Sequence, residues 1–161
     1  MEIRQDMNPP SGDRPARRGF LGYCSTEALF VRRLQTQLAA CRDSSSLDLW
    51  DEARLPAGSL WEHELADALA NASFAVLFVS PDFLASPFIS IYQLPHLLHA
   101  AHTGGTRIIS IIARPCPFEL SSLADFRPVN PPPAKPLVAL STYTRDQFLA
   151  DLVRSLHQLP R

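Results

Sequence analysis

The sequence predicts an α/β fold in which a central parallel sheet of about five strands is covered by helices on both faces. Short apolar segments of strand length alternate along the chain with longer segments whose apolar residues recur at helical spacing. The segment 74–79, FAVLFV, is apolar at every position, which is typical of a strand buried on both faces of a parallel sheet. This alternation is the pattern of βαβ units, in which a helix crosses over to the next parallel strand.

Apolar segments of strand length are expected to build the sheet, at 20–23, 47–50, 74–79, 107–113 and 137–140. The first helix is expected over 26–41, because Phe30, Leu34 and Leu38 recur there at helical spacing. The second helix is expected to open at the S-x-x-E capping box that Ser59 and Glu62 form.

The third helix is expected to begin at Ser86, with Pro87 at its first position and a kink at Pro95. A proline-rich segment that ends in NPPPAKP at 130–136 excludes both a regular helix and a central strand there. Thr144 and Gln147 are expected to cap the last helix.

Composition places the chain among ordinary globular domains and argues against two classes of partner. The net charge is −1, so no overall positive field attracts nucleic acid, and no apolar run reaches the roughly 18–20 residues that span a membrane. Residues 1–17 lack periodicity and are expected to form a flexible lead-in, followed by one domain over 18–161. The cysteines, at 24, 41 and 116, form no paired motif, so a reducing cytoplasmic location is expected.

A metal centre is not expected. His96, His99 and His102 recur every three residues, but no carboxylate or cysteine nearby completes a ligand set. The chain also lacks a G-x-G-x-x-G or Walker motif. No resident cofactor is therefore expected.

Four segments, in this order and spacing, resemble the TIR (Toll/interleukin-1 receptor) domain family over roughly 18–159. They are GFLGYCS at 19–25, LWD with LPAGSLW over 49–61, VLFVSPDFLAS at 76–86 and IISII at 108–112. The resemblance implies a flavodoxin-like, three-layer fold. It further implies a bacterial NAD⁺-cleaving effector of antiphage defence, which hydrolyses the bond between nicotinamide and ribose, so that NAD⁺ is a substrate.

Position 93 departs from the family pattern, because Gln93 stands where the resemblance implies the catalytic glutamate. Glutamine keeps the shape of glutamate without its charge, and the loss of one preorganised electrostatic element typically costs about 10²–10³ in rate. No other carboxylate is an obvious replacement, since Glu62, Glu64 and Asp67 belong to the preceding helix. We expect binding to survive and turnover to be inactivated or attenuated. Either a deliberate Glu→Gln substitution or a natural non-catalytic module accounts for Gln93.

The remaining candidate substrate-binding residues follow from the rule that ligands bind at the carboxyl ends of parallel strands. They are Tyr23 and Cys24 after the first strand, Asp51, Arg54 and Leu55 in the loop 51–58, and Ser86 and Phe88 near Gln93. Each has a structural alternative: Tyr23 and Phe88 can simply pack, Arg54 can be an ordinary surface residue, and Ser86 can serve only as a helix cap.

The resemblance also implies partners other than NAD⁺. TIR domains assemble with one another through the loop 51–58, which the family calls the BB loop, and a sensor domain or partner protein triggers them. A homo-oligomer or filament is therefore expected. The alternative function is a non-catalytic scaffold that signals by TIR–TIR association. A receiver-like domain is disfavoured, because Tyr23, Cys24 and Ser25 occupy the place of its acidic cluster.

Overall fold

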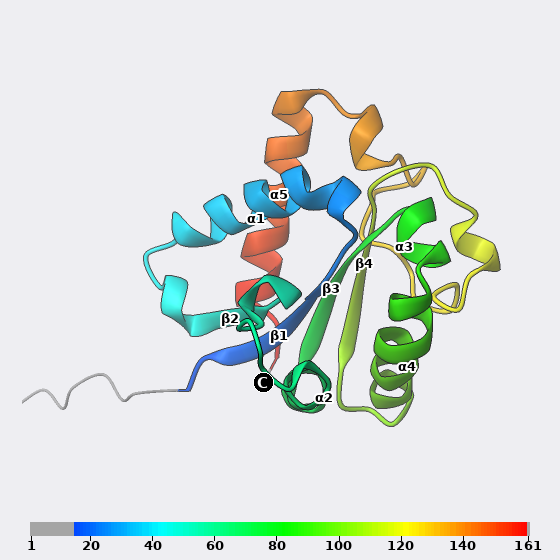
Figure 1. Ribbon diagram of the computed structural model, residues 1–161. Coiled ribbons are helices and arrows are strands. Elements are labelled where there is room, and N and C mark those ends of the chain that lie inside the picture. The colour runs from blue at the N-terminus through cyan, green and yellow to red at the C-terminus, as the bar shows by residue number, and fades with distance from the viewer. Residues whose placement is uncertain (1–14, 161) are drawn as a thin grey trace, which may run out of the picture.

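A computed structural model describes residues 15–160, and its centre is a sheet of four parallel strands (Figure 1). The strands are β1 (Arg17–Gly22), β2 (Leu47–Trp50), β3 (Phe74–Val79) and β4 (Arg107–Ile112). They lie in the order β2-β1-β3-β4. Gly19 of β1 pairs with Leu49 on one side and with Phe74 on the other. The predicted α/β class and parallel sheet are confirmed.

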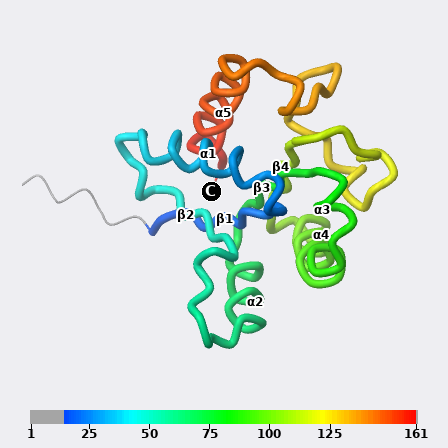
Figure 2. Tube along the Cα trace, turned by 45° about the horizontal axis from the view of Figure 1, so that its top comes forward, coloured from blue at the N-terminus to red at the C-terminus, as the bar shows by residue number. Residues whose placement is uncertain are grey.

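The helices form the two outer layers. They are α1 (Ala28–Ala39), α2 (Trp61–Asn71), α3 (Pro81–Ala85), α4 (Leu94–His102) and α5 (Thr142–His157). The tube view shows α1 and α5 on one face of the sheet and α2 and α4 on the other (Figure 2). Two apolar cores result, one on each face, and every residue of β3 is buried between them.

Gly19 shows why a residue without a side chain is needed in β1. A Cβ atom at this position would lie 2.4 Å from a ring carbon of Phe74 and 2.7 Å from a methyl carbon of Leu49. These distances are shorter than van der Waals contact. The side chains of Phe74 and Leu49 can therefore pack against β1 at this position only if the residue is a glycine.

The predicted fifth strand is wrong, because Leu137–Ala139 forms a 3₁₀ helix. The edge of β4 is covered instead by the chain around Asn130, whose side chain takes the place of a strand. Its Oδ1 accepts a hydrogen bond from the Ile112 N–H (2.8 Å), and its Nδ2 donates to the Ile112 carbonyl (3.1 Å). Backbone contact on either side of Asn130 is limited to single bonds: the Val129 N–H donates to the Ser110 carbonyl (2.9 Å) and the Val138 N–H to the Ala113 carbonyl (3.1 Å). The prolines between them have no N–H to donate to a continuous ladder.

The helix caps are predicted only in part. Ser86 caps the third predicted helix, since its Oγ accepts from the Ile89 N–H at 3.4 Å. The box of Ser59 and Glu62 is wrong, because Leu60 stands at the N-cap of α2 and no side chain caps it. The cap of α5 is Ser141, whose Oγ accepts from the Thr144 N–H.

A π-helical turn over Ile89–Gln93 joins Ser86 to α4. The Leu94 N–H donates to the Ile89 carbonyl, five residues back. Pro95 has no N–H for an α-helical bond, so the distortion expected there takes the form of a widened turn just before it. The turn leaves Ile91 and Tyr92 exposed and buries Gln93.

The first strand begins at Arg17, before the segment 20–23 predicted for it. Residues 1–14 of the predicted lead-in lie outside the described residues, but Arg17 already belongs to β1. Its guanidinium donates to the carbonyls of His157 (2.8 Å) and Leu159. Within residues 15–160, no helix combines the length and apolar character needed to cross a membrane.

Candidate functional site

The sheet order places a topological switch point between β1 and β3. From β1 the chain crosses to β2 on one side, and it later returns to β3 on the other side. Ligands of open α/β sheets bind at such a switch point, beyond the carboxyl ends of the strands. Tyr23 and Cys24 follow β1, Asp51 follows β2, and the turn that carries Gln93 follows β3 and α3.

Gln93 meets a carboxylate that sequence reasoning missed. Its side-chain amide is buried, with 2% of the residue exposed, and its Nε2 donates a hydrogen bond to Oε1 of Glu52. The other amide atom, Oε1 of Gln93, is buried and has no hydrogen-bond partner. Glu52 itself is exposed and begins the 3₁₀ turn Glu52–Arg54. The one signal in the sequence that could have indicated Glu52 is its position directly after Asp51, at the end of a predicted strand.

The titratable groups around this contact influence one another. Although Glu52 as a residue is exposed, partial desolvation of its carboxyl and the nearby charge of Asp51 raise the pKa of that group above its ordinary value, while the hydrogen bond from Gln93 acts in the opposite direction. Burial raises the pKa of Tyr23, and the charges of Asp51 and Glu52 raise it further. The phenol is therefore neutral near pH 7 and can donate a hydrogen bond.

Cys24 belongs to the same neighbourhood. Burial raises the pKa of its thiol most, and the negative charges of Glu27, Asp82 and Glu52 add to the effect. A thiol in such surroundings stays protonated at neutral pH and is a poor nucleophile. Cys24 can therefore line the site, but a thiolate attack is not supported.

Glu27 is a second carboxylate that sequence reasoning missed, and it is fully buried. It accepts hydrogen bonds from Thr26 (2.6 Å), Ser80 (3.0 Å) and the Nε of Arg114 (2.8 Å). Ser80 follows β3 and Arg114 follows β4, so one carboxylate holds together the carboxyl ends of three strands. A buried charge requires this degree of pairing.

The predicted loop residues have structural partners. Asp51 is 4% exposed and accepts from the Ala53 N–H (2.8 Å) and from the Gln35 side chain (3.2 Å), so it fixes the start of the BB loop. Arg54 pairs with Asp48 at 2.5 Å on the surface. Leu55 is half-buried. None of these contacts reaches Gln93.

Ser86 and Phe88 also have local roles. Ser86 caps its helix, as described above. Phe88 packs between Trp61 (ring centroids 5.6 Å apart) and Tyr92 (5.8 Å), which are 38% and 47% exposed. This aromatic cluster of Trp61, Phe88 and Tyr92 lies beside the end of the BB loop.

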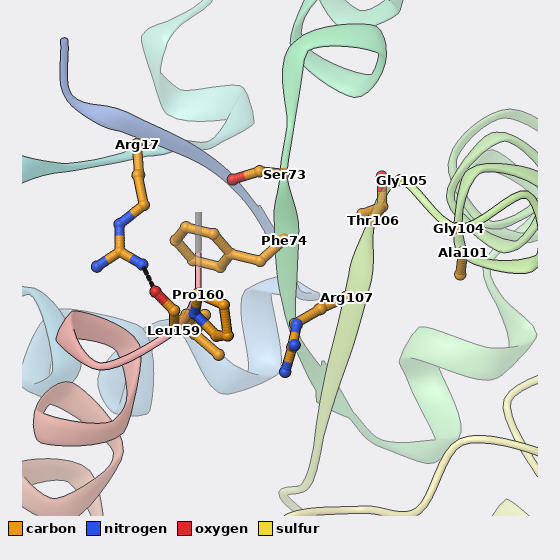
Figure 3. A pocket seen from close by; sticks show the side chains of 10 residues that line it. All are labelled: Arg17, Ser73, Phe74, Ala101, Gly104, Gly105, Thr106, Arg107, Leu159 and Pro160. Carbon is orange, nitrogen blue, oxygen red and sulfur yellow. Dashed lines mark hydrogen bonds between the residues drawn. The ribbon is translucent and has the colours of Figure 1, made fainter.

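A hollow of about 390 Å³ lies at the opposite end of the sheet (Figure 3). Its lining includes Arg17, Phe74 and Arg107, at the amino-terminal ends of their strands, and Gly104 and Gly105, which precede β4. Figure 3 shows the Arg17 guanidinium turned toward the carbonyl of Leu159, which it binds. Because ligands of parallel sheets bind at the carboxyl ends, we do not assign the substrate site to this hollow.

Among residues 15–160, no group of three or more His, Cys, Asp and Glu side chains is arranged to hold a metal ion. The candidate site comprises the Gln93 amide in contact with the Glu52 carboxylate, and the Tyr23 phenol and Cys24 thiol that follow β1. Such a set can hydrogen-bond the hydroxyls of a sugar and place one negative charge beside a cation.

One of the solved structures similar to the chain supports the same fold. The TIR domain of the Toll-related receptor TRR-2 from Hydra magnipapillata superposes with a TM-score of 0.59 at 18% identity, over 86% of this chain and 97% of that one. The TIR domains of the activated Roq1 resistosome, which directly recognizes the pathogen effector XopQ, give a TM-score of 0.49 at 16% identity, over 86% and 84%.

Sequence comparison gives the family. An uncharacterized protein of Sinorhizobium fredii, y4lF, is 25% identical over 97 residues, which cover 60% of this chain and 30% of the relative. The chain thus matches less than a third of that relative's length. The family model described as TIR domain matches residues 20–135, which is most of the described chain. The chain belongs to the TIR domain family.

Proposed function

We propose that the chain binds NAD⁺ at the carboxyl ends of β1 and β3 and hydrolyses its nicotinamide–ribose bond, as an effector module of bacterial antiphage defence. The observation that carries this proposal is the buried amide of Gln93, which has one unpartnered oxygen and one bond to a carboxylate. An orphaned buried polar atom is rare in folded proteins and is costly, unless a ligand or water satisfies it. A ribose hydroxyl is a donor of the right kind.

The reaction makes specific demands that these residues match. As the bond to nicotinamide breaks, positive charge moves onto the ribose ring, and a nearby carboxylate stabilises it. Tyr23, with a neutral phenol, can stack on the nicotinamide or the base and can donate a hydrogen bond. Because the amide at position 93 carries no charge, it slows the reaction relative to a glutamate at the same place. A carboxylate elsewhere in the site can reduce this loss by supplying the missing charge.

Self-association is part of the proposal. Leu60, Trp61, Ile91 and Tyr92 are 72%, 38%, 62% and 47% exposed. Exposed apolar groups that gather beside one loop favour contact with another protein surface. A second TIR domain, docked through the BB loop, is the partner that we propose for this surface, with a sensor domain or partner protein as the trigger. The same surface supports the second candidate function, a scaffold that assembles without chemistry.

Calorimetric titration with NAD⁺, followed by chromatographic measurement of nicotinamide release, tests this proposal. We expect saturable binding, and we expect release to rise more steeply than linearly with protein concentration, because the active form is assembled. A shift of the melting temperature with NAD⁺ concentration provides an independent check on binding. Concentration-dependent assembly without any binding of NAD⁺ would leave the scaffold as the function.

A further inference from the structure

We propose that Glu52 is the catalytic carboxylate of this site and that Gln93 positions it, an inference that rests on the proposed cleavage of NAD⁺. The charge needed for the reaction then comes from the BB loop that follows β2. It does not come from the helix that follows β3, where the resemblance implies it.

The contact between the two side chains is the first argument. The Nε2 of Gln93 binds one oxygen of Glu52, and among the described residues the second oxygen of Glu52 forms no hydrogen bond. Gln93 is held in the π-helical turn Ile89–Gln93 and is almost completely buried, so its amide is a fixed donor. A fixed donor orients a carboxylate that would otherwise rotate freely on an exposed loop.

The charge around Glu52 is the second argument. Within residues 15–160 no cationic side chain lies within salt-bridge distance of Glu52, whereas Asp48, Glu27 and Asp151 each have an arginine partner. The titratable groups that interact with its charge are Tyr23, Cys24 and Asp51, none of which is a cation. A negative charge without a protein counterion is available to a cationic substrate, and the nicotinamide ring of NAD⁺ carries a positive charge.

The third argument is the local backbone, because it fixes the position from which the Glu52 side chain extends. Asp51 accepts from the Ala53 N–H and from Gln35, which anchors the 3₁₀ turn Glu52–Arg54 to α1. Glu52 therefore projects from an anchored turn toward the buried amide. The same turn opens the BB loop, so any partner that moves this loop also moves the charge.

The step balances with water as the only co-reactant. The bond between C1′ of the ribose and the nicotinamide nitrogen breaks, and its electron pair goes to that nitrogen, which becomes neutral. The oxygen of water bonds to C1′, and Glu52 accepts a proton from this water and returns it to solvent. The products are nicotinamide, ADP-ribose and one proton. Oε1 of Gln93 is left to accept a hydrogen bond from a ribose hydroxyl.

The test compares Glu52→Gln with the unmodified chain and with Glu119→Gln, which makes the same change at an exposed position of the 3₁₀ helix Phe118–Leu120, outside the site and outside the proposed docking surface. We expect Glu52→Gln to lower nicotinamide release by about 10²–10³, as for the loss of one preorganised electrostatic element, while Glu119→Gln has no effect. We expect the Kd for NAD⁺ to change by less than about tenfold, because a glutamine at 52 can still hydrogen-bond.

A measurement of stability excludes loss of fold as the cause. Because the pKa of Glu52 is raised in the folded protein, its ionised form destabilises that state, and this cost develops as the pH rises from the ordinary pKa of a glutamate to the raised one. Glu52→Gln should therefore melt at or above the temperature of the unmodified chain near pH 7.5. The two should converge below about pH 4, where Glu52 is protonated in both states. A variant that loses melting temperature and nicotinamide release together would indicate a structural role and overturn the proposal.

Gln93→Glu separates the two ways in which the account can fail. If Glu52 supplies the charge, a second carboxylate beside it shares a proton with it, and release changes by less than about tenfold. If Glu52→Gln matches the unmodified chain, or if only Gln93→Glu releases nicotinamide, the assignment to Glu52 is wrong while the NAD⁺ site stands. If neither the unmodified chain nor Gln93→Glu binds NAD⁺, the proposed function itself is wrong.

Discussion

Glu27→Ala is expected to lower the free energy of unfolding by about 3 kcal/mol and to abolish NAD⁺ binding. The substitution removes a fully buried carboxylate and, with it, the partner of Ser80, Thr26 and Arg114. Loss of one member of a buried pair typically costs about 3–5 kcal/mol, and the lower figure applies because the Arg114 side chain is 40% exposed and can turn to water. Chemical denaturation measures the change in the free energy of unfolding. Thermal denaturation should show a melting temperature that is about 6–12 °C lower.

The surface pair of Asp151 and Arg154 provides the matched control. Its side chains are 61% and 65% exposed, and Asp151→Ala is expected to change stability by less than about 0.5 kcal/mol. Equal effects of the two substitutions would contradict the view that Glu27 ties the strand ends together. Unchanged NAD⁺ binding in Glu27→Ala would show that the site does not depend on this network.

Asn130→Ala is expected to cost about 2–4 kcal/mol, since it leaves the N–H and the carbonyl of Ile112 without partners. Asn130 is 4% exposed, and its side chain binds both of these groups and also the Lys135 carbonyl (2.8 Å). Ile112 is itself buried, so water cannot easily replace the amide. Thermal denaturation should show the loss.

Asn71→Ala is the control for this prediction, because Asn71 is exposed and bonds only to the Asp67 carbonyl of its own helix. We expect it to change the free energy of unfolding by less than about 0.5 kcal/mol. If Asn130→Ala is equally mild, the Asn130 side chain does not substitute for an edge strand in the way argued above.

The fold class was predictable because the spacing of apolar residues along the sequence indicates which segments are buried. The uninterrupted apolar segment 74–79 could hardly be anything but a central strand, and it is buried at every position. The segment 137–140 is also apolar, but its strand prediction failed because pairing depends on what already occupies the edge of β4. The Asn130 side chain satisfies that edge, which no local pattern reveals.

The candidate site was predictable only at the positions that a motif marks. Gln93 could be located by its resemblance to a family segment, but its contact with Glu52, 41 residues away, depends on the π-helical turn and on the anchoring of the BB loop. In the sequence, Glu27 looked like an ordinary helix residue. Its burial depends on the hydrogen bonds from Ser80 and Arg114, which are far away along the chain. Charges that act across strands leave no periodic signal.

Titration of the isotopically labelled protein with NAD⁺, followed by amide chemical shifts, tests most directly whether the carboxyl ends of the strands form the site. We predict the largest shifts at Tyr23, Cys24, Glu52 and Gln93, with the Gln93 side-chain amide among them. Residues of the hollow at the other end of the sheet, such as Ser73, Gly104 and Gly105, should not respond. Shifts confined to that hollow, with Gln93 unchanged, would contradict the account.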